Sequence, residues 1–315
     1  MEDNTMNSIN SNFDLPNQPE YFKNFWDYAR GREDSDAFLE AGKKPSGSYV
    51  LPTSSATKYD EALKRESLFR TIGTYVYSHK GPSKLLGKHT TDAATWVPDG
   101  EAIPIYDGIN DFSEFAMEDH KLAAIMRMDA SFLQDNPHVF GDYFIKRMAR
   151  CFGSAESDGF INGTGVDMPT GILSENGAAV GVTASGINFD DVIRLYFSVD
   201  KQFRQRGAWL MNDDTALAIR LLKDKDGNPI WNHTNDTILG KPVYIDNHMP
   251  SAGAGAKPIA FGDFSFYWIV EREPLTVRVL KEKFFEAGQI GYLAYEFLDG
   301  KLIQPDAVKV LQITA

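Results

Sequence analysis

The sequence has almost no cysteine. Cys151 is the only one among 315 residues, so no disulfide can form within one chain. A chain without disulfides is typical of a reducing cytoplasm. Free cysteines usually pack as small apolar side chains. We therefore expect Cys151 to fill the core on the long helix predicted below.

The sequence also lacks any uncharged apolar run of about eighteen residues, which excludes a transmembrane helix. Residues 1–20 are polar and acidic and contain no apolar stretch of the kind found in secretory signals. Basic residues total 32 against 44 acidic ones, a formal net charge of −12. Such a chain does not offer the basic surface that grips phosphates. If it encloses nucleic acid, it would contain it without adhering to it.

Motifs for catalysis and metal binding are missing as well. There is no HExxH or CxxC, and the histidines form no pair with ligand spacing on one helix face. Residues 81–89 resemble a phosphate-binding loop, but the spacing of their glycines is wrong and His89 replaces the magnesium-binding Ser or Thr. Residues 224–228 resemble half a calcium loop without its final glutamate. We predict no catalytic, cofactor-binding or metal-binding residues. An enzyme with residues 79–112 as a lid is a remote alternative.

The clearest pattern present is a long helix over residues 136–159. Asn136 suits its N-cap and Pro137 its first position. Apolar residues then recur at every fourth position, as Phe140, Phe144, Met148 and Phe152. This period predicts an amphipathic helix. The glycines and Pro169 that follow indicate that it ends near residues 159–165.

A short aromatic helix is predicted over residues 20–30, before Gly31. Its side chains Phe22, Phe25 and Trp26 are too apolar to stay in water. The helix could dock on its own domain, or it could serve as an arm on a neighbouring subunit. The residues leave both alternatives open.

Residues 79–112 form a long excursion with a tip rich in Gly, Pro and Lys. Excursions of this length inside a compact domain are unusual, and most are functional or disordered. Trp96-Val97, Ile103 and Ile105 give it the character of a strand, so we predict a projecting hairpin. An ordinary surface hairpin is the plainer alternative.

A Gly-, Ala- and Ser-rich segment, residues 174–188, marks a candidate domain boundary. Beyond it, a helix capped by Asn188 is expected over 189–206, and a second helix, capped by Asn212, is expected up to residue 222. The alternation of helices and strands there predicts a mixed α/β module. Elsewhere a helix is expected over 58–70. The expected strands are 74–78, 122–128, 208–211, 241–246, 257–261, 267–270 and 275–280, and a hairpin turn at Asp299-Gly300 should precede the last strand.

Several phrases of the sequence resemble, in the same order, the major capsid proteins of tailed phages of the Hong-Kong-97 (HK-97) type. The first half of the chain contributes GSYVLP (47–52), WVPDGEAIP (96–104), KLAAIMRMDASFLQDN (121–136), AESDGFINGTG (155–165) and MPTGIL (168–173). The second half contributes WLMN (209–212), LGKPVY (239–244) and FGDFS (261–265). The resemblance spans about residues 20–313.

This resemblance implies an α+β fold with an N-arm, an extended E-loop hairpin, a peripheral domain with a long spine helix and an axial α/β domain. It divides the chain into an N-terminal extension and N-arm (1–57), the first part of the peripheral domain (58–186), the axial domain (187–258) and return strands completing both (259–315). Within the second part, the E-loop is 79–112 and the spine helix is 136–159.

The implied function is structural. Copies would self-assemble into hexamers and pentamers of an icosahedral head that encloses phage or prophage double-stranded DNA without sequence-specific binding. The implied location is the virion capsid, assembled in the host bacterial cytoplasm. Expected partners are the chain itself, a scaffolding protein and a portal protein, with a decoration protein left open and no membrane. An encapsulin-like nanocompartment shell is the main alternative. The predicted intersubunit contacts are Phe22, Phe25, Trp26, Lys84, Leu85, Leu86, Trp96 and Ile103.

Some members of the family join their subunits by a Lys–Asn isopeptide bond that a glutamate promotes. Lys84 or Lys88 could take the lysine's place, but Gly288 aligns with the asparagine and Tyr295 with the glutamate, with Glu296 one residue away. Because a slip of one residue on a strand reverses the side chain's face, we predict no crosslink.

Overall fold

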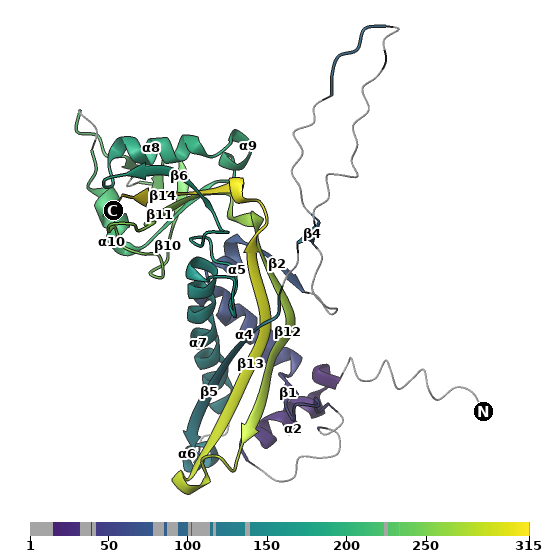
Figure 1. Ribbon diagram of the computed structural model, residues 1–315. Helices are drawn as coiled ribbons and strands as arrows, with labels where there is room; N and C mark the ends of the chain where they lie inside the picture. The colour runs from purple at the N-terminus through teal and green to yellow at the C-terminus, as the bar shows by residue number, and fades with distance from the viewer. Residues whose placement is uncertain are drawn as a thin grey trace. The chain divides into compact units, whose positions relative to one another are not determined.

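The structure is a computed structural model, and it describes residues 15–31, 39, 42–77, 85–86, 94–99, 102, 114–115, 118–135, 139–223, 226–232 and 234–314. The chain forms two compact units (Figure 1). Unit 1 comprises Met1–Thr71, His120–Ser157 and Glu271–Leu298, and unit 2 comprises Ile72–Asp119, Asp158–Val270 and Asp299–Ala315. Each has its own mixture of helices and strands.

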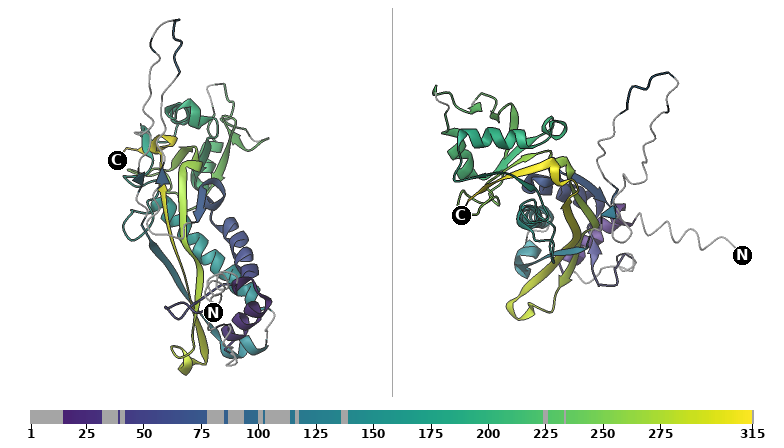
Figure 2. Two further views of the ribbon diagram at one scale, coloured as in Figure 1. Left: turned by 90° about the vertical axis from the view of Figure 1, so that its right-hand side faces the viewer. Right: turned by 45° about the horizontal axis from the view of Figure 1, so that its top comes forward.

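Unit 1 is built on an antiparallel sheet with long helices beside it. The strands run in the order β1 (Tyr49–Val50), β12 (Tyr267–Leu280), β13 (Gln289–Leu302) and β5 (His120–Asp129). Strand β2 (Thr74–Tyr77), which falls in unit 2, also pairs with β12, whose residues 267–270 fall in unit 2 as well. Strands β13 and β5 pair without a break from Gln289↔Asp129 to Leu298↔His120. The helices are α2 (Pro19–Ala29), α4 (Thr53–Glu66), α5 (Phe69–Ile72), α6 (Ala130–Asp135) and α7 (Phe140–Asn162). The views in Figures 1 and 2 show α7 and α4 alongside the long strands.

The predicted apolar stripe of the long helix is confirmed. Phe140, Phe144, Met148 and Phe152 are all buried in the core of unit 1. The rings of Phe140 and Phe144 pack against Tyr292 of β13, with centroids 5.3 and 5.5 Å apart. Residues 136–138, where the helix was expected to begin, lie outside the described residues. The stripe therefore fixes α7 to the sheet, as its period of four residues requires.

The end of α7 explains its glycines. The helix continues through Gly159 to Asn162, and the N–H of Gly163 still donates to the carbonyl of Gly159 at 3.0 Å. A Cβ on Gly163 would lie 2.1 Å from the carbonyl oxygen of Pro169. The turn that follows packs its backbone against the helix end, and a side chain at this position would prevent that contact.

Unit 2 contains a mixed sheet of seven strands. Their order is β6 (Ala179–Ala184), β14 (Val308–Ile313), β11 (Ile259–Gly262), β7 (Ala208–Met211), β10 (Lys241–Ile245), β9 (Thr237–Ile238) and β8 (Trp231–Asn232). Strands β6 and β14 are parallel, as are β7 and β10, and β11 is antiparallel to both of its neighbours. Helices α8 (Phe189–Ser198), α9 (Lys201–Arg204) and α10 (Asp213–Arg220) belong to the same unit. Its core is centred on Trp209, Phe261 and Trp231.

Short 3-10 turns complete the described structure. They are η1 (Leu15–Asn17), η3 (Phe264–Phe266), η4 (Phe285–Ala287) and η5 (Pro305–Ala307). The two-residue strands β3 (Leu85–Leu86) and β4 (Glu114–Phe115) form a separate antiparallel pair.

Three predictions about elements are wrong in detail. The helix expected over 189–206 is broken, because Val199 is extended and a new helical turn begins after Asp200. In that turn the N–H groups of Phe203 and Arg204 donate to the carbonyl of Asp200. Asn188 stands at the N-cap position of α8, but its side chain makes no cap hydrogen bond. The helix expected over 58–70 begins at Thr53 and is interrupted after Glu66. The strands expected over 267–270 and 275–280 are one strand, β12.

The hairpin turn predicted at Asp299-Gly300 is also wrong. Both residues lie inside β13, and the chain turns later, at η5. The Asp299 carboxylate accepts the N–H of Glu118 at 2.8 Å. A Cβ on Gly300 would lie 2.6 Å from the hydroxyl of Tyr267. The glycine here permits close packing instead of a turn, a use that the dipeptide alone does not reveal.

Cys151 was expected in the core, and the structure corrects this. Its side chain is exposed on α7, next in sequence to the buried Phe152. Consecutive residues of a helix point about 100° apart, so Cys151 falls outside the apolar stripe.

Candidate functional site

Helix α2 places the three predicted aromatic residues in different surroundings. Phe25 and Trp26 are buried in the core of unit 1, whereas Phe22 remains 44% exposed. The ring of Trp26 packs edge-on against Phe140 at 5.6 Å, and its Nε1–H donates to the Ser55 hydroxyl at 3.3 Å. The helix thus docks on its own unit, which was one of the two alternatives.

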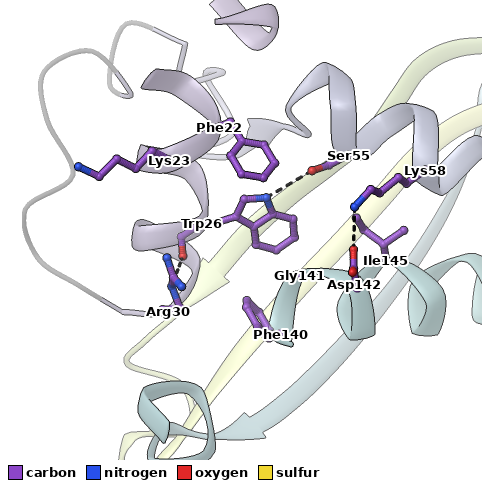
Figure 3. Close-up of a pocket in the computed structure, with 10 residues that line it drawn as sticks. All are labelled: Phe22, Lys23, Trp26, Arg30, Ser55, Lys58, Phe140, Gly141, Asp142 and Ile145. Atoms are coloured by element: carbon purple, nitrogen blue, oxygen red, sulfur yellow. Dashed lines mark hydrogen bonds and ion pairs between the residues drawn. The ribbon is translucent and has the colours of Figure 1, made fainter. Parts of the chain in front are cut away.

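A cavity of about 340 Å³ lies between α2, α4 and α7. Phe22, Trp26 and Phe140 form its apolar wall, as Figure 3 shows. Two cations at its rim are engaged in ion pairs, Lys58 with Asp142 at 3.0 Å and Arg30 with Asp27 at 2.7 Å. The cavity therefore has an aromatic lining, and two of the cations that line it are paired with carboxylates. Lys23 is a third cation of the lining.

The base of the predicted 79–112 excursion is described only in part. Leu85 pairs with Phe115, and Leu86 with Glu114, in the antiparallel sense. Trp96 is fully exposed to solvent. Lys84 and Ile103 lie outside the described residues, as do the side chains of Leu85 and Leu86. In sequence, the solvent-exposed Trp96 thus lies between the two short paired strands, 85–86 and 114–115.

Sequence reasoning missed a cluster of buried charged residues in unit 1. Arg70 of α5 forms a bidentate ion pair with Glu156 of α7, Nε to Oε2 at 2.9 Å and Nη2 to Oε1 at 2.5 Å. Its Nη1 donates to Glu271 of β12 at 3.4 Å, and its Nη2 lies 4.0 Å from Glu296 of β13. Each of these four side chains is at most 7% exposed. No sequence signal could have found the cluster, since its members are far apart along the chain.

The burial of this cluster alters its protonation. Desolvation raises the pKa of Glu296 well above the usual range, and the neighbouring Glu156 raises it further, while Arg70 opposes the shift. Desolvation likewise raises the pKa of the Tyr59 hydroxyl, which donates to Glu296 Oε2 at 3.3 Å. Tyr59 is therefore a neutral donor at physiological pH.

The residues aligned with the family's crosslink lie in separate environments. Gly288 is left-handed, with a φ of 63°, directly after η4. The Tyr295 hydroxyl lies 2.7 Å from the Ser48 hydroxyl. Glu296, the next residue on β13, contacts Arg70 and Tyr59 instead. The prediction that no crosslink forms stays a prediction.

Among the residues that the structure describes, no group of three or more His, Cys, Asp or Glu side chains could hold a metal ion. Within the same residues, no helix is both long and apolar enough to cross a bilayer.

Comparison with known proteins identifies the family. The model of the phage capsid family matches residues 47–313, so the chain belongs to that family. The capsid polyprotein of Pseudomonas phage PAJU2 is 30% identical over 186 residues, which are 55% of this chain and 27% of that protein. The probable major capsid protein gp17 of Mycobacterium phage L5 is 23% identical over 180 residues, 50% of this chain and 54% of that protein. The chain thus spans from about a quarter to about half of the length of these relatives.

Solved structures agree with this assignment. A chain described as "Capsid of empty GTA particle computed with C5 symmetry" has a TM-score of 0.67 and 27% identity to this chain, and the match covers 79% of this chain and 90% of that one. The predicted α+β fold of the HK-97 type is confirmed. Since the family consists of structural capsid proteins, the prediction that the chain is not an enzyme is confirmed as well.

Proposed function

We propose that this chain is a major capsid protein that self-assembles into hexamers and pentamers of an icosahedral head around phage double-stranded DNA. The observation that supports this most strongly is the family match over residues 47–313. A solved capsid chain, of which 90% is covered at a TM-score of 0.67, supports it further. These capsid relatives favour a phage head over an encapsulin-like compartment.

The proposed division of labour follows the family's architecture. Residues 187–258 would cluster at the capsomer centre as the axial domain. Residues 58–186 would form most of the peripheral domain, and 259–315 would return through both. The N-arm within 1–57 and the E-loop, 79–112, would overlap neighbouring subunits.

The residues proposed as intersubunit contacts differ in how much of each side chain is exposed in the single chain. Trp96 is fully exposed and Phe22 is 44% exposed, so both have surface for a neighbour. Phe25 and Trp26 are already covered within unit 1. Their contribution would be to hold α2 in place. The contacts proposed for Lys84, Leu85, Leu86 and Ile103 rest on their positions in the E-loop.

The proposed partners are the chain itself, a scaffolding protein and a portal protein, and a decoration protein is left open. The head would assemble in the host bacterial cytoplasm and persist in the virion. The net charge of −12 fits a wall that contains DNA without binding its phosphates. Terminase and portal proteins encoded beside this chain would support the phage head, whereas an enzyme cargo encoded there would support the nanocompartment.

Deleting residues 81–92 tests the role of the E-loop. We expect a soluble, folded subunit that forms no closed shells, because the deleted segment would bridge neighbours. Circular dichroism would establish folding, and electron microscopy would establish assembly. Normal particles from the deletion variant would contradict the proposed role.

A further inference from the structure

The buried cluster in unit 1 has more carboxylates than its cation can neutralise. Arg70 contributes one positive charge, and Glu156, Glu271 and Glu296 would contribute three negative charges if all were ionised. Nε and Nη2 of Arg70 are bound to Glu156, and Nη1 is bound to Glu271. Glu296 is thus left with the most distant contact, 4.0 Å from Nη2, which is too long for a hydrogen bond.

One oxygen of Glu296 is unsatisfied. Its Oε2 accepts the hydroxyl of Tyr59, but the buried Oε1 has no hydrogen-bond partner. Buried polar atoms are almost always hydrogen-bonded, and each exception needs an explanation. An ionised carboxylate can only accept hydrogen bonds, whereas a protonated one has an O–H to donate. If Oε1 carried a proton, it could donate a hydrogen bond to the neighbouring Glu156 carboxylate, which is an acceptor.

Other charged groups around Glu296 do not supply the missing positive charge. Helix α4 contributes Asp60, whose pKa is raised by burial, with Arg70 and Lys64 opposing the shift and Glu156 adding to it. On β5, the strand paired with β13, Lys121 lies over the ring of Tyr295 at 4.6 Å, and Tyr295 points to the opposite face of the strand from Glu296. Among the described residues, Arg70 is therefore the cation that faces Glu296, from α5, and Glu156 and Glu271 face it from α7 and β12.

We propose that Glu296 is a carboxylic acid at neutral pH, hydrogen-bonded through its proton to Glu156, and that this proton is a built-in pH-sensitive latch of unit 1. The acid–carboxylate pair and Arg70 together join α5, α7, β12 and β13 at one point, with Tyr59 of α4 as a further donor. Loss of the proton would leave an uncompensated buried negative charge, which folded proteins tolerate poorly.

The direction of the pH effect follows from this state. In the unfolded chain Glu296 loses its proton near its ordinary pKa, whereas in the folded chain burial raises that pKa. Between the two values, the folded chain binds more protons than the unfolded chain, so stability falls as pH rises. The stability that protonated Glu296 contributes is fully present below its ordinary pKa and is lost as the pH rises toward the raised pKa. The unfolding equilibrium constant would increase by up to about tenfold for each pH unit in that window.

Glu296→Gln tests the proposal, because an amide has the shape and the donor of the protonated acid but cannot ionise. Urea unfolding of the full chain would be followed from pH 5 to pH 9 for the wild type and the variant. We expect the wild-type midpoint to fall with rising pH and the variant to show a weaker dependence, with a higher midpoint than the wild type at pH 9. The matched control is Glu156→Gln, which breaks the bidentate pair with Arg70 and should lower the midpoint throughout the range.

Two results would overturn the proposal. One is an E296Q variant that loses as much stability as E156Q across the whole range, because Glu296 would then act as a charged partner of Arg70. The other comes from infrared spectroscopy of the wild type and does not depend on the variant's folding. A carboxylic-acid C=O band that persists at pH 7 to 8 is expected, and its absence would show that Glu296 is ionised.

Discussion

At the scale of single residues, Arg70 is the cation of a buried charge cluster in unit 1. Its guanidinium is 5% exposed and contacts three glutamates from three elements. A guanidinium suits this position because its planar fork binds a carboxylate at two points, as it does with Glu156. Arg70 joins distant parts of the chain, because its hydrogen-bond partner Glu271 lies 201 positions further along the sequence.

Arg70→Met should lower the free energy of unfolding by about 3–5 kcal/mol, because it leaves the buried glutamates without their cation. The loss should be smaller at pH 5 than at pH 8, since the glutamates can then take up protons. Urea unfolding at the two pH values would measure both effects. Arg194→Met is the control, because the Arg194 side chain is 71% exposed and its ion pair with Asp191 should contribute less than about 1 kcal/mol. Equal losses in the two variants would contradict this account.

At the scale of elements, the spacing and type of neighbouring residues predicted most of the helices, strands and caps that depend on local interactions. Apolar residues at every fourth position predicted α7, and a strand was expected over 122–128, within β5. The cap at Asn212 was predicted from one residue type in front of a helix. The failures have a different physical origin. Asp299-Gly300 is a turn signal overridden by the pairing and packing of β13. The break between α8 and α9 falls at Val199, whose backbone is extended and whose side chain is buried in the core of unit 2.

The charge cluster could not be predicted at all. A buried Glu has no pattern that distinguishes it from the many exposed acidic residues of this sequence. The contacts of Arg70, Glu156, Glu271 and Glu296 exist only once four separate elements have come together. The exposed Trp96 and half-exposed Phe22, in contrast, were singled out from residue type and position. The surface candidates were therefore accessible to sequence reasoning, and the buried site was not.

Asn212→Ala tests the cap of α10. The Asn212 side chain accepts the N–H of Thr215 at 2.9 Å and donates to Ser251 at 2.7 Å. Its loss should cost about 1–2 kcal/mol of unfolding free energy, from the cap and the second hydrogen bond. Thermal and urea unfolding would measure the change. Asn188→Ala is the control, because the Asn188 side chain donates to Asp191 at 3.2 Å but caps no backbone N–H of α8, so its loss should cost less. A larger loss at Asn188 would contradict the capping argument.

At the scale of the whole molecule, the proposed function depends on contacts between copies, which one chain does not contain. Family membership and the shared fold supply the architecture. The exposed aromatic residues indicate where single substitutions should act. Large aromatic side chains supply more interface free energy than exposed lysines, so the proposed contacts are not equivalent.

Trp96→Ala should weaken assembly more than Lys84→Ala does. Because Trp96 is fully exposed in the single chain, its removal should leave the subunit's unfolding midpoint nearly unchanged. The yield of particles by sedimentation would measure assembly, and Lys84→Ala is the matched control. A Trp96→Ala variant that forms particles at the wild-type yield would remove Trp96 from the contacts.

The central claim is that copies of this chain build a closed shell. Negative-stain electron microscopy, paired with size-exclusion chromatography, tests it most directly on the full chain expressed alone and together with a scaffolding protein. We predict closed shells or rings of capsomers in at least one of the two preparations, and their diameter would bound the number of subunits. A monomer of 35.2 kDa in both preparations would contradict the account.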